Sequence, residues 1–172
     1  MPALIEAARN NLQSRAQAEE AARARSREVS AIHQLYRDMF SDCMSILRGT
    51  NDPAPFYREV PVLREFENLL VKSWGSERRV DRTWEDNAGQ PVTVVLDGWP
   101  LHRNDAYAHL KVEGLPDRLS IYRDPNAKDV KGYIEHKTEK GWEYKDEKAV
   151  TLEEVQQWRE LVGFLKGQQE TQ

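Results

Sequence analysis

No glycine or proline occurs between Pro2 and Gly49, and this gap constrains the fold more than any other feature of the sequence. Glycine and proline are the residues least favourable inside a helix, whereas proline suits a first turn. Gly49, followed by prolines at positions 53 and 55, is a strong stop signal. Residues 3–48 are therefore predicted to form one helix, about 65–70 Å long at 1.5 Å per residue.

The two halves of this predicted helix differ in composition. From Val29 onward, apolar side chains recur every three or four residues and form a wide stripe suited to packing on a core. Before Val29 the stripe fades to Ile5, Leu12 and alanines. We therefore predict a projecting helical arm over residues 1–28, a single α+β domain over 29–167 and a frayed tail over 168–172.

The middle of the chain predicts one more helix and then strands. Pro61 is suited to open a short helix over residues 61–74, with Gly75 as its terminator. Beyond Ser76 the apolar period changes from near 3.6 to 2, which indicates strands. Turn sequences separate them at hairpin spacing, so an antiparallel meander is expected. The six predicted strands cover residues 79–84, 91–97, 106–112, 118–122, 131–137 and 142–145.

Thr151 and Glu154 form a capping-box pattern that predicts the start of a last helix. This amphipathic helix is expected from Leu152 to Lys166, with Gly167 ending it. The predicted class is therefore α+β, with a long N-terminal helix, a second short helix, an antiparallel meander of about six strands and a C-terminal amphipathic helix.

Charge is divided unevenly along the chain. Residues 1–27 carry five arginines and three glutamates, a balance of +2, and the remaining 20 basic and 26 acidic residues give −6. An acidic body does not favour nucleic acid or an anionic membrane. One cysteine forbids an internal disulfide, and no run approaches the roughly 18 apolar residues that cross a bilayer. A soluble cytoplasmic protein is expected.

The arm offers little for a self-standing coiled coil. Steps of three and four from Ile5 pass through Ala8 and Leu12 and then reach a polar centre. A leucine-zipper seam needs Leu, Ile or Val at most of these positions. The arm could therefore be a solvated extension, pair with its own domain or a second copy, or dock on a different protein. The polar centre of the series comprises Arg15, Glu19, Ala22 and Ser26.

Two histidines and two aspartates in one stretch give the enzyme alternative. Asp97, His102, Asp105 and His109 could form an acid–base or metal site. Their spacing matches no metal-ligand pattern, however, and loop residues are commonly polar. His109 alternates with Ala108 and Leu110 and should point away from the core. The sequence holds no glycine-rich phosphate loop either, so we expect no cofactor or bound metal.

Arginines between two tryptophans give the nucleic-acid alternative. Arg78, Arg79, Arg82 and Trp84 combine base-stacking and phosphate-binding residue types. Neighbouring carboxylates cancel their charge, which makes nucleic acid an unlikely partner.

A second aromatic group lies near the end of the predicted meander. Tyr133, Trp142 and Tyr144 should meet across a hairpin as stabilising pairs. If the face that carries them were uncovered, they would instead form an exposed recognition patch.

The interpretation that these patterns favour is a non-enzymatic interaction or assembly module. Its arm would bind a protein partner or a second copy, as in a homodimer, and would use coiled-coil-like contacts. The expected contact residues are Ile5, Ala8, Leu12, Arg15 and Ala22.

Overall fold

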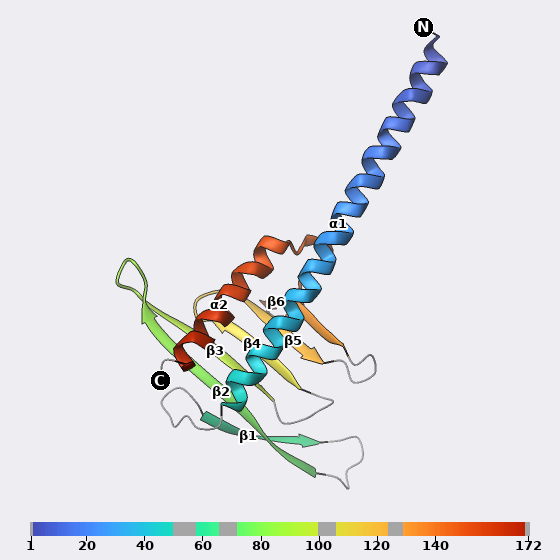
Figure 1. Ribbon diagram of the computed structural model, residues 1–172. Coiled ribbons are helices and arrows are strands. Elements are labelled where there is room, and N and C mark those ends of the chain that lie inside the picture. Colours follow the sequence, from blue (N-terminus) through green and yellow to red (C-terminus); the bar gives the residue numbers. More distant parts are fainter. Residues whose placement is uncertain (1, 50–57, 66–71, 100–105, 124–128, 171–172) are drawn as a thin grey trace.

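The computed structural model describes residues 2–49, 58–65, 72–99, 106–123 and 129–170. Two helices lie side by side on one face of a seven-stranded antiparallel sheet, and the first half of the longer helix extends beyond the sheet (Figure 1). The strands follow one another in space as they do in the sequence, so the sheet is a simple meander. The elements are α1 (Ala3–Arg48), β1 (Arg58–Glu65), β2 (Lys72–Glu85), β3 (Pro91–Trp99), β4 (Tyr107–Val112), β5 (Asp117–Arg123), β6 (Val130–Thr138), β7 (Gly141–Tyr144), a 3-10 turn η1 (Glu147–Ala149) and α2 (Leu152–Glu170).

The α+β class and the long first helix are confirmed. Helix α1 begins directly after Pro2 and ends directly before Gly49, the two residues that the sequence marks as its limits. The six predicted strands correspond to β2–β7, in the predicted antiparallel order.

The short helix predicted over residues 61–74 is wrong for residues 61–65 and 72–74, and residues 66–71 lie outside the described part of the chain. Residues 58–65 form strand β1, and residues 72–74 begin β2, with Gly75 inside that strand rather than after a helix. Eight residue pairs join the two strands, from Arg58 opposite Arg79 to Glu65 opposite Lys72. Pairing with the first half of the long strand β2 therefore prevails over a local pattern compatible with a helix.

The last helix is longer than predicted. Thr151 caps it as expected, accepting a 3.2 Å hydrogen bond at its Oγ1 from the Glu154 backbone N–H. Gly167 does not end α2, which continues to Glu170, so residues 168–170 of the predicted frayed tail are helical. A single glycine costs a helix only about 1 kcal/mol relative to alanine, too little to impose a stop.

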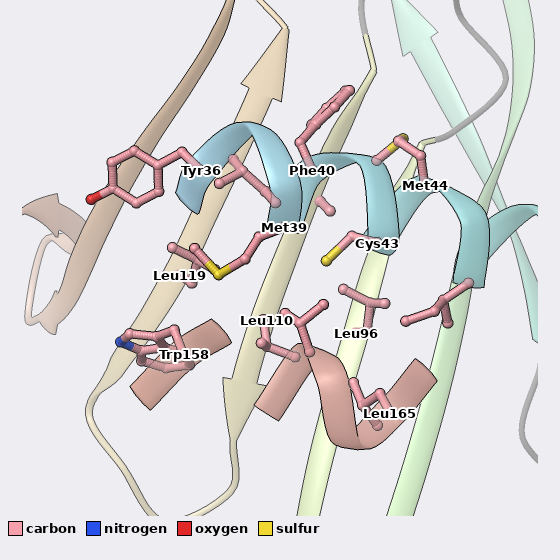
Figure 2. Packing of buried hydrophobic residues seen from close by; sticks show 14 of the residues in the cluster. Tyr36, Met39, Phe40, Cys43, Met44, Leu96, Leu110, Leu119, Trp158 and Leu165 are labelled. Carbon is pink, nitrogen blue, oxygen red and sulfur yellow. The ribbon is translucent and has the colours of Figure 1, made fainter. Parts of the chain in front are cut away.

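The core lies between the sheet and the two helices. Met39 and Cys43 of α1 point towards leucines of β3–β5, and Trp158 and Leu165 of α2 close the same layer (Figure 2). Residues 29–47 supply the apolar stripe that the sequence predicts for packing. The largest fully buried side chains are Met39, Ile46, Leu47, Leu96, Leu110, Leu119, Ile121, Ile134, Val94, Val155 and Val162.

Two glycines allow α1 to lie close to the sheet. The ring of Tyr36 rests on Gly132 of β6 so closely that a Cβ at that position would overlap the ring. At Gly98 of β3 a Cβ would overlap the Tyr107 carbonyl oxygen of the neighbouring strand β4, and it would also lie 3.0 Å from Leu47 Cδ1 of α1. The position of α1 on the sheet therefore depends on these two missing side chains.

Strand alternation gives the sheet two unlike faces. The face towards the helices carries Val94, Leu96 and Leu110, whose successors at odd positions point the other way. The face away from the helices, which we call the open face, is polar and aromatic. No helix in the described part of the chain is long and apolar enough to cross a membrane.

Candidate functional site

The N-terminal half of α1 makes a surface rather than part of the core. Every residue from Pro2 to Ala24 is exposed, whereas Arg25 and Glu28 of the predicted arm over residues 1–28 are half-buried, so from here on we call residues 2–24 the arm. Leu4 is 85% exposed, Leu12 65% and Ile5 49%. The alternative that the arm packs on its own domain is therefore wrong. The predicted contact residues Ile5, Ala8, Leu12, Arg15 and Ala22 are all exposed.

The apolar residues of the arm gather at its tip. At 100° per residue, Leu4, Ile5, Ala8 and Leu12 lie on one side of the helix, within its first three turns. The rest of the arm, residues 13–24, is alanine-rich and charged, and we call it the stem. Glu20 pairs there with Arg23 and Arg27, both at 3.3 Å. The 22 residue steps from Ala3 to Arg25 correspond to about 33 Å of helix, which is how far the tip stands from the body.

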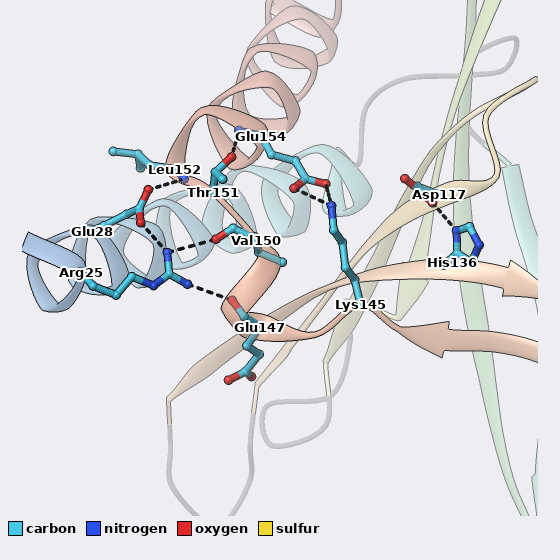
Figure 3. A network of polar contacts seen from close by, with 10 residues as sticks. All are labelled: Arg25, Glu28, Asp117, His136, Lys145, Glu147, Val150, Thr151, Leu152 and Glu154. Carbon is cyan, nitrogen blue, oxygen red and sulfur yellow. Dashed lines mark hydrogen bonds and ion pairs between the residues drawn. The ribbon is translucent and has the colours of Figure 1, made fainter. Parts of the chain in front are cut away.

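A polar network fixes the base of the arm to the body (Figure 3). The Arg25 guanidinium donates to the Val150 carbonyl at 3.2 Å and the Glu147 carbonyl at 2.9 Å, and it also pairs with Glu28. Glu28 in turn accepts a 3.2 Å hydrogen bond from the Leu152 backbone N–H. The bonds from Arg25 and Leu152 lower the pKa of Glu28. The partners lie more than 120 residues away in sequence, so no local pattern indicates this network.

A cavity of about 300 Å³ lies beside this network. Val29, Ile32 and Tyr36 of α1 line it, together with Lys145 and Lys148. The Lys145 amine is bound to both carboxylate oxygens of Glu154, each at 3.0 Å. Two of the cations that line the cavity, Arg25 and Lys145, are therefore neutralised by carboxylates of the protein.

The structure brings together two of the four candidate enzyme residues. Asp97 and His109 face each other across β3 and β4 on the open face, with His109 Nδ1 3.4 Å from Asp97 Oδ1. His102 and Asp105 lie outside the described residues. Among those that are described, no group of three or more His, Cys, Asp or Glu residues could hold a metal ion. Cys43 is fully buried, and burial raises the pKa of its thiol well above the ordinary range, which disfavours a nucleophilic role.

The candidate nucleic-acid residues do not form one surface. Arg78 and Arg82 lie opposite Gly98 and Val94, on the side of the sheet that faces the helices. Arg78 Nη1 donates to the Leu47 carbonyl at 3.1 Å. Arg79 points to the open face and pairs with Asp81 at 2.7 Å. Trp84 lies in β2, and its side chain is outside the described part of the structure.

The open face gathers a different set of aromatic and basic residues, of which the sequence indicated Tyr133, Trp142 and Tyr144 but not Tyr122 or the cations. The Tyr133 ring stacks on Tyr144 at 4.4 Å between centroids and on Tyr122 at 5.9 Å. The predicted cross-strand packing of Tyr133 and Tyr144 is thus confirmed. Trp142 instead lies under cations, and the nearest is Arg118, 4.2 Å from the ring centroid. The alternation of the strands contains this signal, but the strand register is needed to assemble it.

Comparison of the chain with protein-family models, with curated proteins and with solved structures finds no match.

Proposed function

We propose that this protein is a non-enzymatic interaction module that binds another protein, or a second copy of itself, through the tip of its N-terminal arm. One observation carries the proposal: the helix continues, fully exposed, for the length of residues 2–24 and presents Leu4, Ile5 and Leu12 at its far end. Exposed apolar side chains that cluster on one side of a surface helix are typical of helix-in-groove recognition.

The free energy gained by burying the apolar residues of the tip limits how tightly the tip alone can bind a partner. Complete burial of three such side chains supplies at most about 5–9 kcal/mol. Association costs at least about 4 kcal/mol in lost translational and rotational freedom. Contact by one tip alone is therefore weak. The exposed alanines of the stem allow a close backbone approach and can extend the contact.

The base of the arm makes this contact more favourable than the same residues on a free peptide. The bonds that Arg25 makes to Glu147 and Val150 hold the stem against the start of α2. The helix is thus continuous with a packed core, and a partner does not have to order it from a coil. This pre-organisation supports a role in docking rather than a role as a solvated extension.

Self-association is tested by sedimentation velocity on the full chain over a wide concentration range. If copies bind through the tip, the wild type shows a concentration-dependent dimer that Leu4→Gln/Leu12→Gln weakens. Leu115→Gln is the matched control, because Leu115 is another exposed leucine but lies in a turn of the body. A wild type that stays monomeric throughout refutes the homodimer.

Binding to a different protein is tested by a photo-crosslinking amino acid at position 12, with position 17 as the control. Gln17 is exposed and lies about 140° around the helix from Leu12. The proposal expects a discrete adduct in the source cell from position 12 and not from position 17. Equal adducts from both positions, or none from position 12 in a chain that is also monomeric, would refute the proposed function.

A further inference from the structure

The four strands β4–β7 present a patch of cations and aromatic rings on the open face. Register places Lys111, Arg118, Glu135 and Tyr144 in one cross-strand row. Lys137 stands opposite Trp142 at the edge of the sheet. Towards β3 the same face is more enclosed, since Val95 and Trp99 are buried there. Within the patch, Lys131, Lys137 and Tyr144 are exposed, Lys111, Arg118 and Trp142 are half-buried, and Glu135 is buried.

Three cations converge on one indole ring in the patch. The Arg118 guanidinium lies 4.2 Å from the centroid of a Trp142 ring, and the amines of Lys111 and Lys137 lie 5.8 Å and 5.9 Å from it. Glu135 binds Arg118 at 3.1 Å and compensates only one of these charges. Like charges that gather at this range repel one another, and an anion placed among them would relieve that repulsion.

The patch is positive although the body is acidic. Its cations are Lys111, Arg118, Lys131 and Lys137, and its carboxylate is Glu135, which gives 4 − 1 = +3. Residues 28–172 carry −6 in all, so the rest of the body carries −6 − 3 = −9. The separation of charge orients a polyanion towards β4–β7 and away from the remaining surface.

Aromatic rings lie beside these cations on the same edge strand. Tyr144 is 65% exposed and ends the stacked series that runs from Tyr122 through Tyr133. Trp142 is two residues away on the same face of β7, which places the two residues about 7 Å apart along the strand. A ligand that approaches this edge therefore meets a ring face and a group of cations together.

From this juxtaposition we infer that the β4–β7 patch binds single-stranded nucleic acid, with a base stacked on Tyr144 and phosphates beside Lys111, Arg118 and Lys137. Single strands offer flat rings and regularly spaced anions, which match a stacking platform flanked by cations. A duplex keeps its bases stacked inside and offers only its phosphates to this surface. The inference is independent of the arm and of the partner that the arm binds.

The test is a fluorescence-anisotropy titration of the full chain with a labelled twelve-nucleotide oligothymidylate at several salt concentrations. Three phosphate contacts predict that log K falls with log salt at a slope of about −2, since each contact on a single strand contributes about −0.7. Lys111→Gln/Lys137→Gln should weaken binding and bring the slope to about −0.7. Arg9→Gln/Arg23→Gln removes the same charge from the arm and should change neither quantity.

Stacking is tested at Tyr144, which is exposed and lies on the edge strand, so that its substitution removes only the stacking contact with Tyr133 from the fold. Tyr144→Leu should weaken binding by roughly 5-fold or more, because a stacked base contributes about 1–3 kcal/mol. Tyr144→Phe keeps the ring and should bind like the wild type. Circular dichroism melting of each variant verifies that the fold is retained.

Several results would overturn the inference. They are no binding at low salt, equal losses in the patch and arm variants, and an unchanged affinity in Tyr144→Leu. Binding of a duplex as tight as that of the single strand would reduce the patch to a general polyanion site and would equally refute it. None of these outcomes bears on sedimentation or crosslinking by the arm, so the two proposals fail separately.

Discussion

Substitution of Gly132 by alanine should disturb the packing of α1 on the sheet. A Cβ at position 132 would overlap the Tyr36 ring, with Cδ2 of that ring only 2.7 Å away. Tyr36 is 4% exposed and belongs to the main core cluster, so its ring cannot swing into solvent without leaving a cavity. Relief therefore requires a shift of the ring towards the adjoining cavity, which Tyr36 and Gly132 both line, or movement of the helix that bears Tyr36.

The expected cost is the difference between two opposing terms. Overpacking of a core costs about 1–3 kcal/mol, and an overlap with three atoms of one ring at once belongs near the upper end. Alanine regains about 0.5–1 kcal/mol over glycine in the interior of a strand. Gly132→Ala should therefore lower the free energy of unfolding by about 2 kcal/mol, measured by urea titration with circular dichroism.

Removal of the ring should reverse the sign of this effect. In a Tyr36→Ala background the overlap is gone, so Gly132→Ala should be neutral or stabilising by up to about 1 kcal/mol. Gly163→Ala in α2 is the control glycine, because its Cβ would meet only Arg159 Nη1 at 3.7 Å. That substitution should stabilise the protein by up to about 1 kcal/mol. An equal cost of Gly132→Ala in both backgrounds would refute the packing of Tyr36 on Gly132.

Two further predictions concern the arm and its base. Leu12→Gln should leave the unfolding free energy within about 0.5 kcal/mol of the wild type, whereas Leu47→Ala on the same helix should cost about 2–5 kcal/mol, because only Leu47 is buried. A large loss in Leu12→Gln, measured by the same urea titration, would mean that the arm packs on the body. The lowered pKa of Glu28 means that its stabilisation is present above the unfolded-state pKa and disappears as pH falls through the folded-state pKa. The melting temperatures of the wild type and Glu28→Gln should therefore differ at neutral pH and converge below about pH 4, and a constant difference down to pH 2 would contradict this.

Much of the backbone could be predicted because its signals are local. Pro2 and Gly49 bound α1 through their own conformational limits, and Thr151 caps α2 through a bond three residues away. Strands β2–β7 are likewise predicted by the alternation of their apolar side chains and by the turn sequences between them. The helix predicted over residues 61–74 is wrong because the outcome there depends on a partner strand. The local pattern of these residues is compatible with a helix, and only the availability of β2 as a partner makes β1 a strand.

Of the two candidate surfaces, the arm could be predicted from the sequence and the β4–β7 patch could not. Exposure of the arm follows from its sequence, because alanine and charged residues favour a helix but give a core little to bury. The β4–β7 patch does not follow, since Lys111, Arg118 and Trp142 come from three strands and are uninformative apart. Alternation predicts which side chains share a face of one strand, but not which strands adjoin or which face the helices cover.

The sequence by itself therefore determined a continuous opening helix, the change from a packing half to an exposed half, and the class of the fold. The tertiary structure alone decided the seventh strand, the anchoring of Arg25 to residues 147–150 and the meeting of three cations around Trp142. The physical reason is the distance along the sequence over which each interaction acts. Backbone propensity and side-chain period act over a few residues, whereas strand pairing and charge clustering join residues that only the folded chain brings together.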